Sequence, residues 1–196
     1  MIILGLTGSI GMGKSTTAGF FADAGIAVYN ADEAVHELYK SAPVIQWFKQ
    51  NFPKCLTDGQ IDREKLSQEI IADPEKLELL EKYIHPLVRE KEKAFVKNHR
   101  DKGDKLVVLD IPLLFEKGPE GRVDKIVIVS APKSIQRQRV LARPGWSDKK
   151  FDHILSRQIP DREKRKRADF VIDTGQGLDH AKAEVGLLIQ QLTTDN

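Results

Sequence analysis

The sequence has little of what disulfide-stabilised or membrane-spanning proteins need. Its single cysteine, Cys55, excludes a disulfide within the chain and is compatible with a reducing compartment. Residues 1–11 are apolar, but they lack a basic flank and are too short to span a bilayer. Internal repeats and low-complexity linkers are also missing. We therefore expect a soluble, cytoplasmic protein without a membrane partner.

Net charge is also scarce, at +2, yet it is unevenly distributed. Residues 133–167 hold 12 basic and 4 acidic residues, a local net charge of +8, so the rest of the chain carries −6. Such a segment can bind nucleic acid, a membrane or a polyphosphate, or it can simply face solvent. The choice among these depends on the motifs around it.

The 196 residues suit one domain with a small insertion. Short apolar runs, separated by helical patterns, occur at residues 2–7, 26–29, 106–110, 125–129 and 170–172. This alternation predicts a three-layer α/β fold, in which helices cover both faces of a five-stranded parallel sheet. Residues 36–100 are charged, helical in pattern and without a convincing strand, so they are expected to form a helical insertion between the second and third strands.

A phosphate-binding loop is predicted at residues 8–15, GSIGMGKS, which match G-x-x-x-x-G-K-[ST] between a strand and a helix. Glycines let backbone N–H groups point inward at phosphate oxygens, and the helix N-terminus favours negative charge. Lys14 is expected to reach the β and γ phosphates, and Ser15 to bind Mg²⁺. The predicted ATP-binding residues are Gly8, Gly11, Met12, Gly13, Lys14, Ser15 and Thr16.

Among phosphate-loop proteins, a small-molecule kinase fits best. The chain has no N-K-x-D or D-x-x-G element, which disfavours a GTPase, and it is short for a motor or transporter ATPase. Phosphoryl transfer requires charge neutralisation, and Arg139 and Arg143 lie one helical turn apart in the basic segment. We therefore predict an arginine-rich lid at about residues 143–167, with Arg139 and Arg143 acting on the phosphates.

Two aspartates follow predicted strands, at the sheet edge where α/β proteins bind ligands. Asp32 is a candidate to accept the proton of the attacking hydroxyl, although an aspartate there can equally cap the next helix. Asp110 is a candidate to hold Mg²⁺ or its water shell, with a structural turn as the alternative.

Taken together, these motifs resemble the dephospho-coenzyme A kinase family nearly end to end. The phosphate loop alone is generic, whereas the later motifs are specific. The matching segments are residues 6–16, Ala31-Asp32, the run IHPLV at 84–88, the run DIPLLFE at 110–116, Gln136 with Arg139 and Arg143, Gln158, Lys164, and ADFVI at 168–172.

The resemblance implies transfer of a phosphoryl group from ATP, with Mg²⁺, to the ribose 3′-hydroxyl of dephospho-coenzyme A in the last step of coenzyme A synthesis. It implies a nucleotide-binding core at residues 1–35 and 101–196 and an acceptor domain at 36–100. Asp32 matches the proposed general base. The implied acceptor site also includes His85, Arg89, Asp110, Leu113 and Phe115. A nucleic-acid partner is not expected, and the oligomeric state stays open, with a monomer compatible.

Three positions depart from the family pattern. Asn30 stands where the family often has aspartate, and Asp173 stands where it often has asparagine. The change at Asp173 bears on the loop expected near adenine. Met12 replaces a frequent serine, with little expected consequence because the loop binds through backbone N–H groups.

Two other functions stay open. One is a kinase of the same fold acting on another small molecule, such as a nucleoside monophosphate or shikimate. Against a monophosphate acceptor, residues 33–88 contain only one arginine, Arg63. The other is a nucleotide-dependent binding protein without turnover, whose basic segment would hold nucleic acid.

Overall fold

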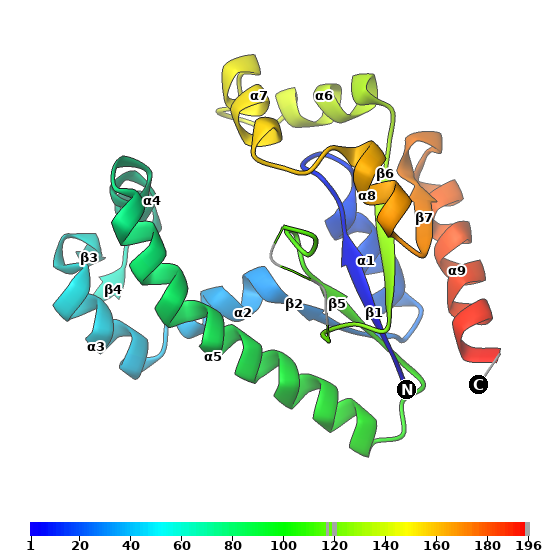
Figure 1. Ribbon diagram of the computed structural model, residues 1–196, viewed down its shortest axis with the longest axis horizontal. Coiled ribbons are helices and arrows are strands. Elements are labelled where there is room, and N and C mark those ends of the chain that lie inside the picture. The colour runs from blue at the N-terminus through cyan, green and yellow to red at the C-terminus, as the bar shows by residue number, and fades with distance from the viewer. Residues whose placement is uncertain (117, 119–120, 195–196) are drawn as a thin grey trace. The chain divides into compact units, whose positions relative to one another are not determined.

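The computed structural model describes residues 1–116, 118 and 121–194 (Figure 1). The chain divides into two compact units, one formed by residues 1–29 and 96–196 and the other by residues 30–95. In the described part of the chain, every helix is too short or too polar to cross a bilayer.

The first unit is built on a five-stranded sheet in the order β2-β5-β1-β6-β7. The strands are β1 (Ile2–Thr7), β2 (Ala27–Asn30), β5 (Leu106–Asp110), β6 (Lys125–Ser130) and β7 (Phe170–Asp173). The pairs β1–β5, β1–β6 and β6–β7 are parallel. All five residues of β5 are buried, as expected for a parallel strand covered on both faces. The predicted α/β fold is confirmed.

Helices of the first unit include α1 (Lys14–Asp23), α6 (Lys133–Leu141), α7 (Asp148–Ser156), α8 (Asp161–Arg167) and α9 (Leu178–Thr194), with a 3-10 turn, η2, at Thr174–Gln176. Helices α1, α8 and α9 contact strands of the sheet, whereas α7 packs on α6. Phe21 of α1 and Val185 of α9 join Leu6 and Val127 of the sheet in one buried cluster. Ser147 caps α7 by accepting a hydrogen bond from Lys150 N, a role that serine often has at a helix start.

The second unit is mainly helical. It contains α2 (Ala31–Leu38), α3 (Ala42–Asn51), the 3-10 turn η1 (Pro53–Cys55), α4 (Arg63–Ala72) and most of α5 (Pro74–Asp101). Its own core includes Phe48, Phe52 and Ile84. The rings of Trp47 and Tyr83 stack in parallel, with centroids 4.1 Å apart.

The expectation that residues 36–100 contain no strand is wrong at one point. Strands β3 (Leu56–Thr57) and β4 (Gln60–Ile61) form a short antiparallel hairpin. Asp58 and Gly59 connect them, and both have positive φ, 50° and 76°. An Asp-Gly pair with this geometry is the favoured two-residue hairpin turn, so the signal was present in the sequence but covered only two residues on each side.

Candidate active site

The phosphate loop lies where the sequence predicted, between β1 and α1, and its glycines are sterically required. Gly11 and Gly13 have positive φ, 76° and 89°, and Gly13 caps α1. A Cβ on Gly11 would lie 2.5 Å from Cγ2 of Val140 and 2.9 Å from the Gln136 carbonyl oxygen. Side chains would therefore push the loop off the elements that support it.

Two glutamines hold this loop through the backbone of Ile10. Gln158 Oε1 accepts a hydrogen bond from Ile10 N at 3.1 Å, and Gln136 Nε2 donates one to Ile10 O at 2.7 Å. Gln136 comes from α6, whereas Gln158 follows α7. Both matched the family pattern, but sequence reasoning gave them no role because the contacts span more than a hundred residues.

Met12 and Thr174 anchor the other side of the loop. The Met12 side chain is buried, and its Sδ accepts a hydrogen bond from Ala131 N at 3.1 Å. Thr174 Oγ1 donates to Met12 O at 2.8 Å. The expectation that the Met12 side chain has little consequence is therefore corrected, because this side chain forms part of the core beneath the loop.

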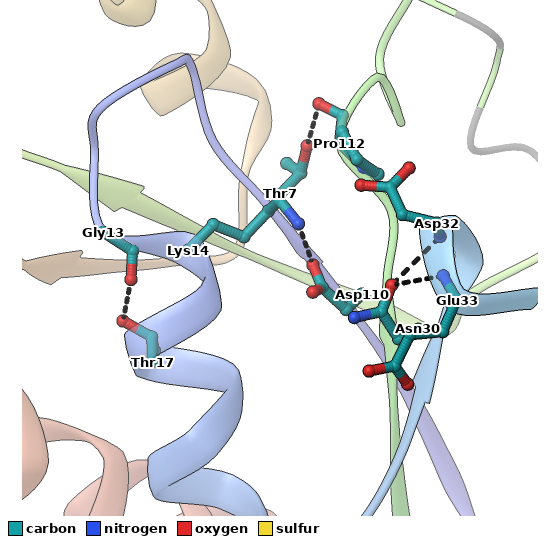
Figure 2. A network of polar contacts seen from close by, with 9 residues as sticks. All are labelled: Thr7, Gly13, Lys14, Thr17, Asn30, Asp32, Glu33, Asp110 and Pro112. Atoms are coloured by element: carbon teal, nitrogen blue, oxygen red, sulfur yellow. Dashed lines mark hydrogen bonds and ion pairs between the residues drawn. The ribbon is translucent and has the colours of Figure 1, made fainter. Parts of the chain in front are cut away.

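Lys14 and Asp110 form a nearly buried ion pair. Figure 2 shows the Lys14 side chain reaching from the start of α1 to Asp110 Oδ1, at 2.5 Å. Asp110 ends β5, and its sheet partner is Leu6 of β1, just before the loop. The pairing places a carboxylate beside the ammonium group that is expected to bind phosphate.

The residues present fit Mg²⁺ in the manner of phosphate-loop enzymes. Mg²⁺ usually keeps several waters and takes one or two protein oxygens together with substrate phosphates. Ser15, exposed in the first turn of α1, and Asp110 can supply oxygens of this kind. Within the described residues, no group of three or more His, Cys, Asp or Glu side chains forms a separate metal site.

A cavity of about 260 Å³ adjoins the phosphate loop. Arg139 and Arg143 both line it, as expected from their spacing. The Arg139 guanidinium donates to Thr174 Oγ1 at 3.0 Å and to Thr174 O at 2.7 Å, and the Arg143 guanidinium lies 5.9 Å from the Trp146 ring centroid. The remaining residues that line the cavity are Gly11, Gly13, Thr16, Thr17, Phe20, Thr174, Gly177, Leu178 and Ala181.

The sequence did not predict most of the apolar residues and backbone that line this cavity. It did indicate the loop after the last strand, which was expected near adenine. Asp173 shapes that loop, since Oδ1 accepts from Gly175 N at 2.8 Å and caps η2. Hydrogen bonds from Gln176 and Gly175 hold the pKa of Asp173 below its ordinary value. An asparagine oxygen can accept the same backbone bond, so this departure from the family pattern preserves the turn.

The predicted lid, residues 143–167, contains α7 and α8 and is tied down by a buried lysine. Lys164 is fully buried, and its Nζ lies 2.8 Å from Glu116 Oε1. The same oxygen accepts a hydrogen bond from Ile159 N at 3.0 Å. This carboxylate therefore fixes the segment that follows Gln158, the residue bonded to the phosphate loop.

Two predicted acceptor residues lie in the segment before Glu116. Leu113 is half-buried, and Phe115 is buried, with the Arg167 guanidinium 4.6 Å from its ring centroid. A lid residue thus stacks on Phe115.

Asp32 lies in the second unit, in the first turn of α2, and its side chain is exposed. Asn30 is the cap, and its Oδ1 accepts from Asp32 N at 2.9 Å and from Glu33 N at 3.1 Å (Figure 2). The alternative that Asp32 caps this helix is therefore wrong, because Asn30 already does so. The Asp32 carboxylate stays available for another role.

His85 and Arg89 lie one turn apart on α5, and both face carboxylates. His85 Nε2 is 3.9 Å from Glu81 Oε1, and Arg89 Nη1 is 3.8 Å from Glu92 Oε1. Both residues make further interactions. Their predicted contact with the acceptor stays a prediction.

Comparison with known proteins identifies the family. The model of the family described as dephospho-CoA kinase matches residues 2–180. A dephospho-CoA kinase from Mesorhizobium japonicum is 55% identical over 194 residues, covering 98% of this chain and 97% of that protein. A crystal structure from Thermus thermophilus is 35% identical, with a TM-score of 0.84 and 98% of each chain covered. The dephospho-CoA kinase structure from Campylobacter jejuni, at 24% identity, shares the fold with a TM-score of 0.67 over 98% of this chain and 97% of its own. The chain belongs to the dephospho-CoA kinase family.

Proposed function

We propose that this enzyme transfers the γ-phosphoryl group of ATP to the ribose 3′-hydroxyl of dephospho-CoA, giving CoA and ADP in the final step of coenzyme A synthesis. Together with membership of the family, one observation carries the proposal. Lys14 of the phosphate loop is ion-paired to Asp110, and the loop adjoins a cavity lined by Arg139 and Arg143. This arrangement is suited to a nucleoside triphosphate.

In the proposed reaction, the 3′-oxygen bonds to the γ phosphorus while the bond from that phosphorus to the β–γ bridging oxygen breaks. Asp32 accepts or aligns the proton of the hydroxyl. Lys14 contacts the β and γ phosphates, and Arg139 and Arg143 neutralise charge on the transferred group. Ser15 and Asp110 would hold Mg²⁺, which would supply positive charge to offset that of the phosphates.

Lys14 must exchange its partner when the nucleotide binds. In the structure its ammonium group neutralises the Asp110 carboxylate at 2.5 Å. Phosphate oxygens would compete for the ammonium group, and a cation would replace it beside Asp110. The ion pair thus keeps both charges compensated before substrate arrives, which a nearly buried site requires.

On the acceptor side, we propose that His85, Arg89, Asp110, Leu113 and Phe115 contact dephospho-CoA. The exposed Asp32 carboxylate supports its assignment as the residue nearest the reacting hydroxyl. We further propose a cytoplasmic enzyme that requires no nucleic acid. The lone buried Cys55 supports a reducing compartment.

The test is ADP release from Mg·ATP with dephospho-CoA, AMP, adenosine and shikimate as separate acceptors, with the phosphate position of the product mapped. A 3′-phosphorylated product, made efficiently from dephospho-CoA alone, is the expected result. Preference for AMP or shikimate would establish a different kinase of the same fold. Salt-sensitive oligonucleotide binding without ADP release would establish a binding protein instead.

A further inference from the structure

The second unit contains a cavity of about 540 Å³ that the proposed chemistry does not use. Its lining comes from α2 and the segment after it, from α3, from the β3–β4 hairpin and from the first residue of α4. The lining residues are His36, Tyr39, Lys40, Ile45, Gln60, Ile61 and Arg63. We call it the α2–hairpin cavity. None of these residues is acidic and two of them, Lys40 and Arg63, are basic, so the polar side of the cavity favours an anion.

The basic groups of this cavity are available to a ligand. In the part of the chain that the structure describes, Arg63 forms no ion pair. Lys40 Nζ lies 3.9 Å from Glu37 Oε1, but both side chains are 64% exposed, so this pair contributes little. Arg63 in particular offers a planar set of donors suited to phosphate oxygens.

Tyr39 adds a neutral donor beside Arg63. Burial raises the pKa of the Tyr39 hydroxyl, and the positive charge of Arg63 opposes that rise. The phenol therefore stays protonated at neutral pH and can donate a hydrogen bond to an anionic oxygen.

The rest of the cavity suits an extended chain that contains amides. Ile45 and Ile61 are half-buried and offer apolar surface, and Gln60 offers an amide. The pairing of Leu56 with Ile61 holds the hairpin, and the turn at Asp58-Gly59 closes it. The hairpin that the sequence did not predict thus forms one wall of the cavity.

Helix α2 connects this cavity with Asp32. His36 follows Asp32 by one turn, so the two side chains share a face of the helix. From Asp32 to the end of α2 at Leu38 the helix rises about 9 Å. A ligand whose hydroxyl lies at Asp32 and whose body follows α2 would therefore enter the cavity.

We propose that the α2–hairpin cavity binds the diphosphate and the adjoining pantetheine arm of the acceptor, with Arg63 and Tyr39 on the phosphates and Ile45 and Ile61 on the arm. This inference rests on the proposed function. In dephospho-CoA the diphosphate leaves the ribose on the side away from the 3′-hydroxyl and continues into an arm with two amides. The cationic and apolar parts of the cavity match these two parts of the ligand.

The decisive variant is Arg63→Gln, with Lys49→Gln as the matched control. Lys49 is an exposed cation of the same unit that does not line the cavity. We expect Arg63→Gln to raise KM for dephospho-CoA by about ten- to a hundredfold, the range for a hydrogen bond between charged groups, with kcat and KM for ATP nearly unchanged. Lys49→Gln should match the wild type in all three.

Two fragments locate the effect within the acceptor. 4′-Phosphopantetheine carries the arm and a phosphate but no adenosine, and it should compete with dephospho-CoA in the wild type and lose affinity in Arg63→Gln. Adenosine, which lacks the diphosphate, should inhibit both proteins equally. An unchanged KM for dephospho-CoA in Arg63→Gln, or equal weakening of both fragments, would overturn the cavity assignment. If the wild type makes no 3′-phosphorylated product, the proposed function fails instead, whatever the fragments show.

Discussion

The buried pair of Lys164 and Glu116 gives the sharpest test of how the lid supports the phosphate loop. Lys164 is the only buried residue of α8 among the seven that the helix contains, and the carboxylate of Glu116 neutralises it at 2.8 Å. Substituting Lys164→Met fills similar space but leaves the Glu116 charge without its cation. The substitution therefore removes the positive charge while it preserves most of the packing.

The size of the effect follows from burial. Removing one partner of a buried ion pair costs about 3–5 kcal/mol. The Glu116 side chain is 14% exposed, so water partly solvates the remaining charge. We expect the lower end, about 3 kcal/mol. For a chain of this length that lowers Tm by about 6–12 °C.

The double variant Lys164→Met/Glu116→Gln separates charge from packing. The glutamine oxygen still accepts from Ile159 N, while the uncompensated charge is gone, so most of the lost stability should return. Lys166→Met is the control, because its exposed pair with Glu163 at 3.0 Å contributes less than about 1 kcal/mol.

Urea denaturation measures all three variants, and KM for ATP adds a second readout. Because Gln158 precedes the segment held by Glu116, the single variant should also raise KM for ATP, and the double variant should reverse that rise. A double variant as unstable as the single one would refute the charge argument. A control as unstable as Lys164→Met would refute the role of burial.

Three further predictions concern the site and the second unit. Lys14→Ala should abolish measurable turnover and weaken ATP binding, which calorimetry with ATP checks; tight ATP binding would exclude its phosphate contact. Asp32→Asn should keep ATP affinity while lowering kcat by about a hundredfold or more, the range for a general base, and an unchanged kcat would exclude that role. Burial and a hydrogen bond to Glu69 raise the pKa of the Cys55 thiol from 9.0 to about 12. The folded state thus favours the neutral thiol, and the stability that this thiol contributes relative to Cys55→Ala should be fully present below pH 9. Above pH 9 the difference in unfolding free energy between the two proteins should shrink by up to about 1.4 kcal/mol per pH unit. A difference that stays constant from about pH 8 to 11 in urea titrations would contradict this.

Patterns of neighbouring residues predicted the phosphate loop and the strands. The glycine spacing of residues 8–15 predicted the loop, because only backbone without side chains can approach the elements behind it. Apolar runs predicted the five strands. At Asp32 the pattern could not separate a cap from a catalytic group, because an aspartate after a strand suits both roles. The structure separates them, since Asn30 caps the helix.

Contacts between distant residues could not be predicted in this way. The sheet order β2-β5-β1-β6-β7 places residues 106–110 beside β1, which brings Asp110 to Lys14. No pattern near Ile10 indicates that Gln136 and Gln158 will bind its carbonyl and N–H. Such partners are selected by packing after the strands pair.

By itself, the sequence determined the phosphate loop, the five strands and a chemistry based on nucleotides, because each depends on the conformations and side chains of neighbouring residues. Only the tertiary structure decided how Lys164, Glu116 and Gln158 support the loop and how the hairpin and α2 enclose a cationic cavity. The physical reason is that burial and charge compensation act between side chains that chain topology alone brings together.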